Sequence, residues 1–350
     1  MAQTFNTIAD LLDHGFDALI DARSPAEFAH DHIPGAINLP SLSDRERHDV
    51  GTTYTQISAF TARKMGAALL ARNVADHVEH RLSDHDGSWR PLVYCWRGGQ
   101  RSGAFSIILQ QIGWRADLLD GGYMQWRRLV KTALYDTPLA HRFILLDGNT
   151  GTAKTAILAR LAAKGVQTID LEGLAGHRGS LLGATAAGQP DQKWFESQLA
   201  TQLARLDPAR PIVVEAESSK VGNINLPQQI WQAMQAAPRI LIAADLPERA
   251  KFLETAYADI VHNPSELARR LDPLRNLRGH DTVGKWLDLL DKGDMRGLAA
   301  ALMTDHYDPA YAKSRKAKSH KVLTQIAAKS LDMAGQDALA DQIIDTINGL

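Results

Sequence analysis

The segment HRFILLDGNTGTAKTAILARLAAKG (residues 141–165) is the strongest indication of the fold of this chain. An apolar run that predicts a buried strand is followed by a glycine-bearing loop and then by a helical pattern. The loop, GNTGTAKT, closely matches G-x-x-x-x-G-K-[ST], in which backbone N–H groups surround phosphates and the lysine reaches their outer oxygens. We therefore predict a phosphate-binding loop, whose binding residues are Gly148, Thr150, Gly151, Lys154 and Thr155.

Ala153 departs from this pattern, which has glycine immediately before the lysine. That position usually needs a backbone conformation that alanine tolerates less well, so a tighter or slightly displaced loop is expected. Glu215 and Glu217 end a later apolar run, PIVVEAE. They either support Mg²⁺ or its waters, as an acid at that strand end does in P-loop proteins, or are solvated or locally paired. No adenine-specific signature is found, so ATP hydrolysis is not predicted.

A second strand–loop–helix pattern surrounds the single cysteine, Cys95. The apolar run PLVYC leads directly into WRGGQRS, and a helix is predicted to begin at Ser102. Backbone N–H groups, together with Arg97 and Arg101, would lower the pKa of this thiol and stabilise an anionic group on its sulfur. A lone cysteine at a strand end is often buried and inert, but the two arginines and two glycines favour a reactive one.

Short apolar runs alternate with helical patterns along most of the chain, which predicts an α/β protein. After Pro138 the alternation restarts at the phosphate loop, and four strands with intervening helices predict a doubly wound sheet. From Pro247 onward only helical periodicity is found. The predicted parts are a small α/β domain at residues 1–138, a P-loop α/β domain at 139–250 and a helical C-terminal region at 251–350.

Composition and charge exclude several classes of protein. The chain has 350 residues, of which 45% are hydrophobic and 23% charged, so it is core-forming and not disordered. Its 39 basic and 40 acidic residues give a formal net charge of −1, so a nucleic acid would be held by a local patch. One cysteine excludes an intrachain disulfide and suits a reducing compartment. With no signal-peptide pattern and no bilayer-spanning stretch, a cytoplasmic location and no membrane partner are expected.

Three segments of the first predicted domain resemble the rhodanese sulfurtransferases. The loop CWRGGQRS (95–102) is similar to their C-x5-R active-site loop, DARSPAEFAHDHIPGAINLP (21–40) to their first signature and LDGGYMQW (119–126) to their closing segment. In that family the loop cysteine carries a transferable chalcogen as a persulfide or its analogue. The resemblance implies a rhodanese-like domain in which Cys95 handles the chalcogen while Arg97 and Arg101 hold its anionic adduct.

Strings in both predicted α/β domains and in the helical region resemble one family, the bacterial tRNA 2-selenouridine synthases. They are DRERHDVGTTYTQ (44–56), YCWRGGQRS (94–102), GNTGTAKT (148–155), DLEGLAGHRGS (170–180), QPDQKWFE (189–196), VEAESSKVG (214–222) and HYDPAY (306–311). The resemblance implies replacement of sulfur by selenium in wobble 2-thiouridine of tRNA, with selenophosphate as donor. It also implies an S-geranyl intermediate made from geranyl diphosphate, whose diphosphate the loop would hold. Cys95 would then either carry selenium or assist its attack.

Further residues of these strings are expected at the substrates. His177, Arg178 and Lys193 are cationic or titratable, so they either contact diphosphate or tRNA or are surface charges near a loop. Trp96, beside the cysteine, either stacks on an unpaired wobble base or belongs to the core. Two basic clusters of the helical region either contact tRNA phosphates or form solvated faces. The clusters are Arg269, Arg270, Arg275 and Arg278, and Lys313, Arg315, Lys316, Lys318 and Lys321.

Two other functions stay open at this point. A thiosulfate-type sulfurtransferase fused to a small-molecule P-loop kinase would turn over ATP without RNA. A non-catalytic RNA-binding module with a vestigial loop would not need both Cys95 and Arg101. The expected co-substrates are selenophosphate and geranyl diphosphate, and no tightly bound cofactor is expected. Whether Mg²⁺ takes part depends on which alternative holds for Glu215 and Glu217. Because the 13 histidines show no HExxH-type spacing, no structural metal is expected.

Overall fold

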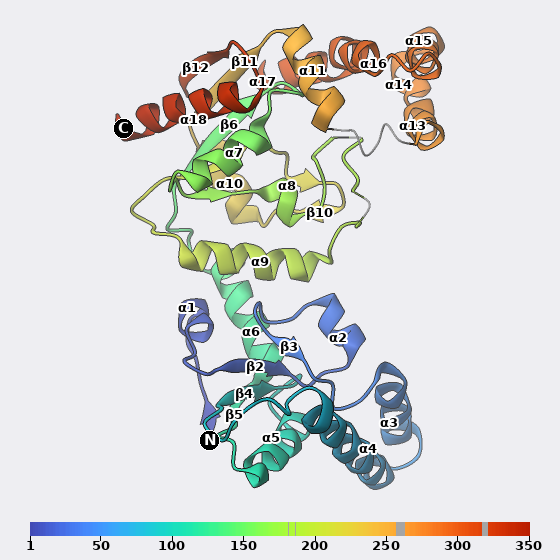
Figure 1. Ribbon diagram of the computed structural model, residues 1–350, viewed down its shortest axis with the longest axis vertical. Helices are drawn as coiled ribbons and strands as arrows, with labels where there is room; N and C mark the ends of the chain where they lie inside the picture. Colours follow the sequence, from blue (N-terminus) through green and yellow to red (C-terminus); the bar gives the residue numbers. More distant parts are fainter. Residues whose placement is uncertain (181, 186, 257–262, 317–320) are drawn as a thin grey trace. The chain divides into compact units, whose positions relative to one another are not determined.

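The computed structural model describes residues 1–180, 182–185, 187–256, 263–316 and 321–350 (Figure 1). The chain forms two compact units. Unit 1 comprises Met1–Pro138 and Pro190–Arg205, and unit 2 comprises Leu139–Gln189 and Leu206–Leu350. Each unit contains a five-stranded parallel sheet with helices, so the predicted α/β fold class is confirmed.

Unit 1 is built on a sheet with the strand order β1-β5-β4-β2-β3. Its elements are β1 (Ala2–Gln3), α1 (Ile8–Leu12), β2 (Ala18–Asp21), α2 (Pro25–His30), β3 (Ile37–Asn38), α3 (Asp44–Gln56), α4 (Ala59–His80), β4 (Pro91–Tyr94), α5 (Gln100–Ile112), β5 (Asp117–Leu119), α6 (Gly122–Lys131), the π-helical turn η1 (Thr132–Asp136) and α9 (Gln192–Arg205). β4, the central strand, is buried along its whole length, as expected for a parallel strand covered on both faces.

The helix α9 differs from the sequence prediction, which placed residues 139–250 in one domain. It packs in unit 1, where the Trp126 indole N–H donates to Ser197 Oγ at 3.0 Å. Arg127 also forms an ion pair with Glu196 at 2.5 Å. The partners of Trp126 and Arg127 both lie on α9, about 70 residues further along the chain. No local sequence pattern predicts a contact over that separation.

Unit 2 is built on a sheet with the strand order β12-β11-β6-β8-β7 and a short antiparallel hairpin of β9 and β10. Its first elements are β6 (Phe143–Gly148), α7 (Lys154–Ala163), β7 (Thr168–Ile169), α8 (Leu171–Leu174), β8 (Ile212–Glu215), β9 (Lys220–Val221), β10 (Ile224–Asn225), α10 (Gln228–Ala236), β11 (Arg239–Ala244) and α11 (Leu246–Ala256). The remainder are α13 (Pro264–Leu271), η2 (Asp272–Leu274), α14 (Arg275–Arg278), α15 (His280–Asp291), α16 (Met295–Leu302), η3 (Met303–Tyr307), α17 (Asp308–Lys316), β12 (Val322–Ala328) and α18 (Met333–Asn348).

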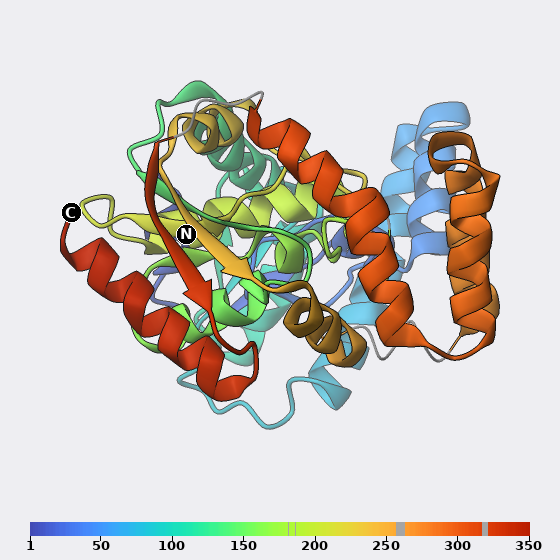
Figure 2. The ribbon, with the colours of Figure 1, turned by 90° about the horizontal axis from the view of Figure 1, so that it is seen from above.

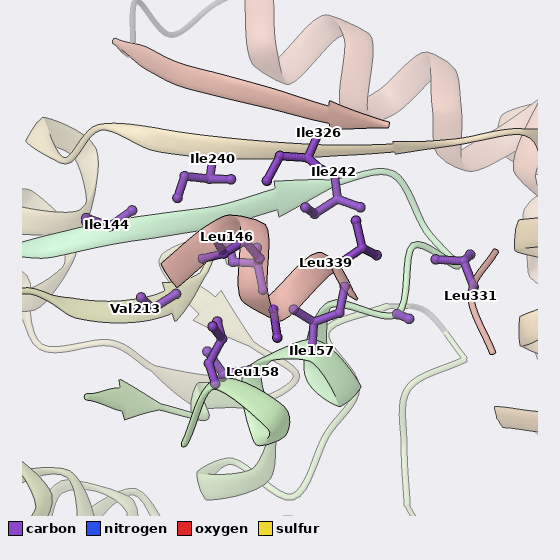
Figure 3. Close-up of a cluster of buried hydrophobic side chains, with 14 residues drawn as sticks. Ile144, Leu146, Ile157, Leu158, Val213, Ile240, Ile242, Ile326, Leu331 and Leu339 are labelled. Atoms are coloured by element: carbon purple, nitrogen blue, oxygen red, sulfur yellow. The ribbon is translucent and has the colours of Figure 1, made fainter. Parts of the chain in front are cut away.

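The core of unit 2 lies between the sheet and the helices α7 and α18, as Figure 3 shows. Leu146 from β6, Ile157 from α7 and Ile343 from α18 are fully buried there. Burial of each such aliphatic side chain contributes about 1.5–3 kcal/mol. This core fixes β6 and α7, and therefore holds the two ends of the phosphate loop.

β12 contradicts the prediction that residues 251–350 are helical. It pairs in parallel with β11 and extends the sheet, beside which α18 runs (Figure 2). β12 lies at the edge of the sheet, so most of its side chains are partly or fully exposed. Its sequence, VLTQIAA, therefore lacks the continuous apolar run that marks a central strand. The P-loop sheet therefore uses residues well beyond 250.

No helix among the described residues is both long and apolar enough to cross a membrane.

Candidate functional site

Cys95 lies directly after β4, where the strand leads into the turn that begins α5. Its side chain is buried, and the Ser102 hydroxyl donates to its sulfur at 3.1 Å. Burial by itself raises the pKa of the Cys95 thiol, but hydrogen bonds from Ser102 and the Gly99 backbone, with the charge of Arg101, outweigh it. The pKa is therefore lower than that of an ordinary cysteine, which favours the reactive thiolate.

Two glycines allow the Cys95 loop to pack against the start of α6. Gly122 has a φ of +55°, and a Cβ there would lie 2.3 Å from the Cys95 carbonyl oxygen. Gly98 has a φ of +66°, and its Cβ would lie 2.7 Å from the Leu119 carbonyl oxygen. In return, the Tyr123 N–H donates to the Cys95 carbonyl at 2.9 Å. The backbone around the thiol is thus held by close contacts at Gly98 and Gly122, where a Cβ atom would clash.

A hollow of about 450 Å³ opens over Cys95. Arg97, which is exposed, lines it together with Arg47, and Arg101 lies at its edge in an ion pair with Glu27 at 2.8 Å. Burial raises the pKa of Glu27, but Arg101 outweighs burial and holds it below the usual range. The three predicted residues Cys95, Arg97 and Arg101 therefore share one hollow, although Arg101 is shared with a carboxylate.

Trp96 also lines this hollow and is half-buried. Its ring packs against that of Tyr123 at a centroid distance of 5.1 Å. One part of the ring is therefore packed while the residue also lines the hollow, and stacking on a wobble base stays a prediction.

The phosphate loop joins β6 to α7, as the sequence predicts. Ala153 is in the left-handed region, with a φ of +58°, and no other non-glycine residue of the described ranges has a positive φ. Ala153, which stands where the pattern has glycine, therefore adopts the left-handed backbone conformation that glycine favours. The Lys154 ammonium donates to the Gly148 carbonyl at 3.1 Å. Burial lowers the pKa of Lys154, but Tyr311, Glu215 and further acids outweigh it, so Lys154 is held charged.

Carboxylates gather beside the first turn of α7. The Thr155 hydroxyl donates to Glu215 at 2.6 Å and lies 3.4 Å from Glu172. Burial, reinforced by Glu215 and Glu217, raises the pKa of Glu172, and burial with Asp170 raises that of Glu215. Glu215 Oε2 is buried with no hydrogen-bond partner among the described residues. A cation would relieve this repulsion and supply the missing partner.

A hollow of about 460 Å³ lies over the phosphate loop. The structure brings together there most of the residues predicted to bind substrate. Those lining it are Thr150, Gly151, Lys154, Thr155, His177 and Arg178. Gly148 stands behind the loop, where a Cβ would lie 2.4 Å from Thr152 Oγ1. Lys193 lies on α9 in unit 1, exposed and outside both hollows.

His177 is the titratable group of this hollow. Burial lowers the pKa of its imidazole, opposed by the charge of Glu217, so the neutral ring is favoured. Its Nδ1 is buried with no hydrogen-bond partner among the described residues.

The first basic cluster of the helical region is largely paired with neighbouring groups. Arg269 and Arg270 both bond Glu266, Arg275 bonds Asp272 at 2.7 Å, and Arg278 donates to His306 at 3.0 Å. These pairs reduce the free positive charge that a phosphate backbone would meet.

In the second cluster, Arg315 bonds Asp147 at 3.0 Å and Asn149 at 2.7 Å, next to the phosphate loop. Lys313 is exposed on α17, and Lys321 precedes β12. Lys318 and the side chain of Lys316 lie outside the described residues.

Sequence reasoning missed several residues that the structure places at the two loops. Glu27 and Arg47 line the Cys95 hollow, Tyr311 places its ring 5.8 Å from the Lys154 ammonium, and Glu172 approaches Thr155. All four lie within the sequence strings quoted above, which was the one signal available. Across the described residues, no group of three or more His, Cys, Asp or Glu side chains has metal-binding geometry.

Comparison with known proteins agrees with this arrangement. The family described as the tRNA 2-selenouridine synthase AAA domain matches residues 141–274, and the rhodanese-like domain family matches residues 4–129. A tRNA 2-selenouridine synthase of Pseudomonas syringae pv. tomato is 32% identical over 353 residues, which cover 91% of this chain and 93% of that protein. One from Verminephrobacter eiseniae is 33% identical over 342 residues, covering 87% and 91%. One from Cupriavidus pinatubonensis is 31% identical over 344 residues, covering 87% and 90%.

Proposed function

The chain belongs to the tRNA 2-selenouridine synthase family, and from this premise we propose that it exchanges sulfur for selenium in wobble 2-thiouridine of tRNA through an S-geranyl intermediate. The co-substrates are geranyl diphosphate and selenophosphate. The two units divide the chemistry, with the diphosphate handled by the phosphate loop and the selenium by the Cys95 loop.

In the first step the thiouridine sulfur attacks C1 of the geranyl chain. An S–C bond forms, the C–O bond to the diphosphate breaks, and the diphosphate leaves with the electron pair while N3 of the base gives up its proton to solvent. Lys154 and the backbone N–H groups of the loop are suited to stabilise the charge that develops on that leaving group. These groups would contact only the phosphates of a ligand. Their placement therefore supports a diphosphate site and does not require a nucleotide.

In the second step selenium attacks C2 of the base. The C2–S bond breaks, and the geranyl thiolate leaves and takes up a proton. An unalkylated sulfur would leave C2 far less readily. Water cleaves the P–Se bond and releases phosphate. Cys95 acts in this step, either by carrying selenium or by assisting its attack, and Arg97 and Arg101 offset the negative charge of the donor.

The observation that carries the proposal is the Cys95 sulfur, which accepts a hydrogen bond from Ser102 under a hollow lined by arginines. A lowered thiol pKa and an anion-binding hollow are what a residue that handles selenium or sulfur needs. The same features suit thiosulfate, and the second loop with its hollow of about 460 Å³ favours the two-step reaction over plain sulfur transfer.

Mg²⁺ fits the second loop. Thr155 and Glu215 would hold the ion or its waters, and the buried Glu215 Oε2, which lacks a hydrogen-bond partner among the described residues, supports that position. The ion would supply charge neutralisation for the diphosphate. No tightly bound cofactor is proposed, and the cytoplasm is the proposed location because tRNA is the substrate.

Mass spectrometry of nucleosides tests the proposal. Thiouridine-containing tRNA is incubated with the protein and geranyl diphosphate, and selenophosphate is added afterwards. The expected result is a geranylated nucleoside that appears first and is then replaced by selenouridine. Neither product, together with turnover of thiosulfate in the presence of cyanide, would instead identify a plain sulfurtransferase.

A further inference from the structure

A second cavity of unit 2 is lined almost entirely by apolar side chains. Leu253 of α11, Leu267 of α13 and Leu298 with Ala299 of α16 form much of its wall. The mechanism proposed above uses none of these residues. Leu267 and Leu298 are buried and belong to the core cluster of the C-terminal helices, so the cavity wall is held firmly.

This apolar cavity adjoins the hollow over the phosphate loop. Thr150, Ser180 and Leu253 line both spaces, so a ligand with its anionic end on the loop can place its other end among the leucines. The hollow over the phosphate loop offers Lys154 and backbone donors, whereas the apolar cavity offers hydrocarbon side chains. A molecule that satisfies both is an amphiphile, with a diphosphate at one end and a short hydrocarbon chain at the other.

A nucleotide suits this pair of spaces poorly. Its ribose and base would bring hydroxyl, amino and carbonyl groups into a cavity whose wall offers few partners for them, and a buried polar group without a hydrogen bond is costly. A prenyl chain has no such groups. The cavity has a volume of about 70 Å³, and the unbranched Met295 and Met303 in its wall are adaptable side chains that can move aside for a longer chain.

We propose that the apolar cavity formed by Leu253, Leu267, Leu298 and Ala299 holds the hydrocarbon chain of a prenyl diphosphate and selects its length. The inference rests on the proposed function, to which it adds the site of the chain. It assigns specificity to the C-terminal helices, whereas the phosphate loop binds every diphosphate alike.

Binding measurements with three ligands test this assignment. They are geranyl diphosphate, dimethylallyl diphosphate and inorganic pyrophosphate, each measured by calorimetry with the full chain and Mg²⁺. Since each buried CH₂ contributes roughly fourfold in affinity, geranyl diphosphate is expected to bind at least about tenfold more tightly than the five-carbon ligand. Ala299→Phe fills the cavity and should remove that preference, while the affinity for pyrophosphate stays within about twofold.

The control is Ala300→Phe, on the same helix and equally half-buried but outside the cavity wall, which should keep the wild-type preference. Met295→Ala enlarges the cavity and should increase the affinity for the fifteen-carbon farnesyl diphosphate relative to geranyl diphosphate. Comparable thermal unfolding of the variants shows that each is folded.

The outcomes separate this inference from the proposed function. Equal binding of the ten-carbon and five-carbon ligands, or an unchanged preference in Ala299→Phe, overturns the inference while geranylation of tRNA can still stand. If geranyl diphosphate and pyrophosphate both fail to bind, the prenyl step of the proposed function fails and the inference falls with it.

Discussion

The Cys95 loop and the phosphate loop are built alike, since each joins the end of a buried parallel strand to the N-terminus of a helix, yet their charges differ. Arg47 and Arg97 line the hollow over Cys95, with Glu27 as the acid paired to Arg101. Glu172 and Glu215 crowd the phosphate loop and offset Lys154. The charges around the first hollow therefore suit an anion alone, whereas those around the second suit an anion together with a cation.

Backbone geometry alone therefore does not assign the chemistry of either loop. The two loops share the strand–turn–helix geometry, but their side chains differ, and we propose a chalcogen on sulfur for the first and a diphosphate with Mg²⁺ for the second. The predictions below separate the two loops, beginning with the change that should abolish one half-reaction.

Cys95→Ser is expected to lower selenation roughly 10³-fold or more, because a hydroxyl replaces the only thiol of the chain. Geranylation should stay within about twofold of wild type, since it depends on the other loop. Nucleoside mass spectrometry of each half-reaction measures both effects. Full selenation by the variant would remove Cys95 from the mechanism.

Lys154→Ala is expected to lower geranylation roughly 10²-fold, because the buried ammonium no longer faces the leaving diphosphate. Alkylation of Cys95 by iodoacetamide should be unchanged. Lys164→Ala, at the far end of α7 where the lysine pairs with Asp341, is the matched control. Equal losses in both half-reactions would contradict a division of labour between the loops.

Ser102→Ala is expected to slow alkylation of Cys95 near neutral pH by roughly tenfold, because one hydrogen bond to a charged sulfur is lost. The pKa of Cys95 should rise, so the pH–rate profile shifts to higher pH. Ser106→Ala supplies the control, since Ser106 is buried on the same helix and its Oγ has no hydrogen-bond partner among the described residues. The same shift in both variants would assign the effect to packing.

The sequence predicted both loops because each is a local pattern, with an apolar strand, a glycine-bearing turn and a helix start. It also predicted the fold class, since apolar runs that alternate with helical patterns indicate a sheet covered by helices. It missed β12, whose edge position leaves no continuous apolar run, and the place of α9 in unit 1, which depends on Trp126 and Arg127 far away in the chain. The approach of Glu172 to Thr155 was equally invisible, because only folding brings them together.

The crowded carboxylates predict a pH dependence of stability. Burial and neighbouring acids raise the pKa of Glu172 and Glu215, so the folded chain keeps protons that the unfolded chain has lost. Stability should therefore fall as pH rises above about 4.5, by at most about 1.4 kcal/mol per pH unit for each retained proton. Glu172→Gln should flatten this slope in urea unfolding, and Mg²⁺ should do so in the wild type.

The exposed Glu79, on α4 in the other unit, provides the control for this slope. Glu79→Gln should leave the pH dependence of unfolding unchanged. A slope that is the same in Glu172→Gln and in the wild type would show that the cluster does not retain protons.

The smallest expected effect concerns Ala153, which holds in the phosphate loop a left-handed conformation like that of Gly98 in the Cys95 loop. Ala153→Gly relieves about 1–2 kcal/mol of strain but loses about 0.8 kcal/mol of buried methyl and about 0.5–1 kcal/mol of chain entropy. The net change should lie within about 1 kcal/mol of zero, with diphosphate affinity unchanged. The thermal midpoint and calorimetry measure both.

Gly98→Ala is the reciprocal change and should not be neutral. Its Cβ would lie 2.7 Å from the Leu119 carbonyl oxygen, so the backbone of β5 or of the Cys95 loop must move, whereas the Ala153 methyl already packs in the core of unit 2. A destabilisation of about 2 kcal/mol or more is expected, together with slower alkylation of Cys95. Stability changes of equal size and opposite sign in the two variants would mean that φ alone sets the cost. Unequal ones would mean that the neighbours of each loop decide which residue it tolerates.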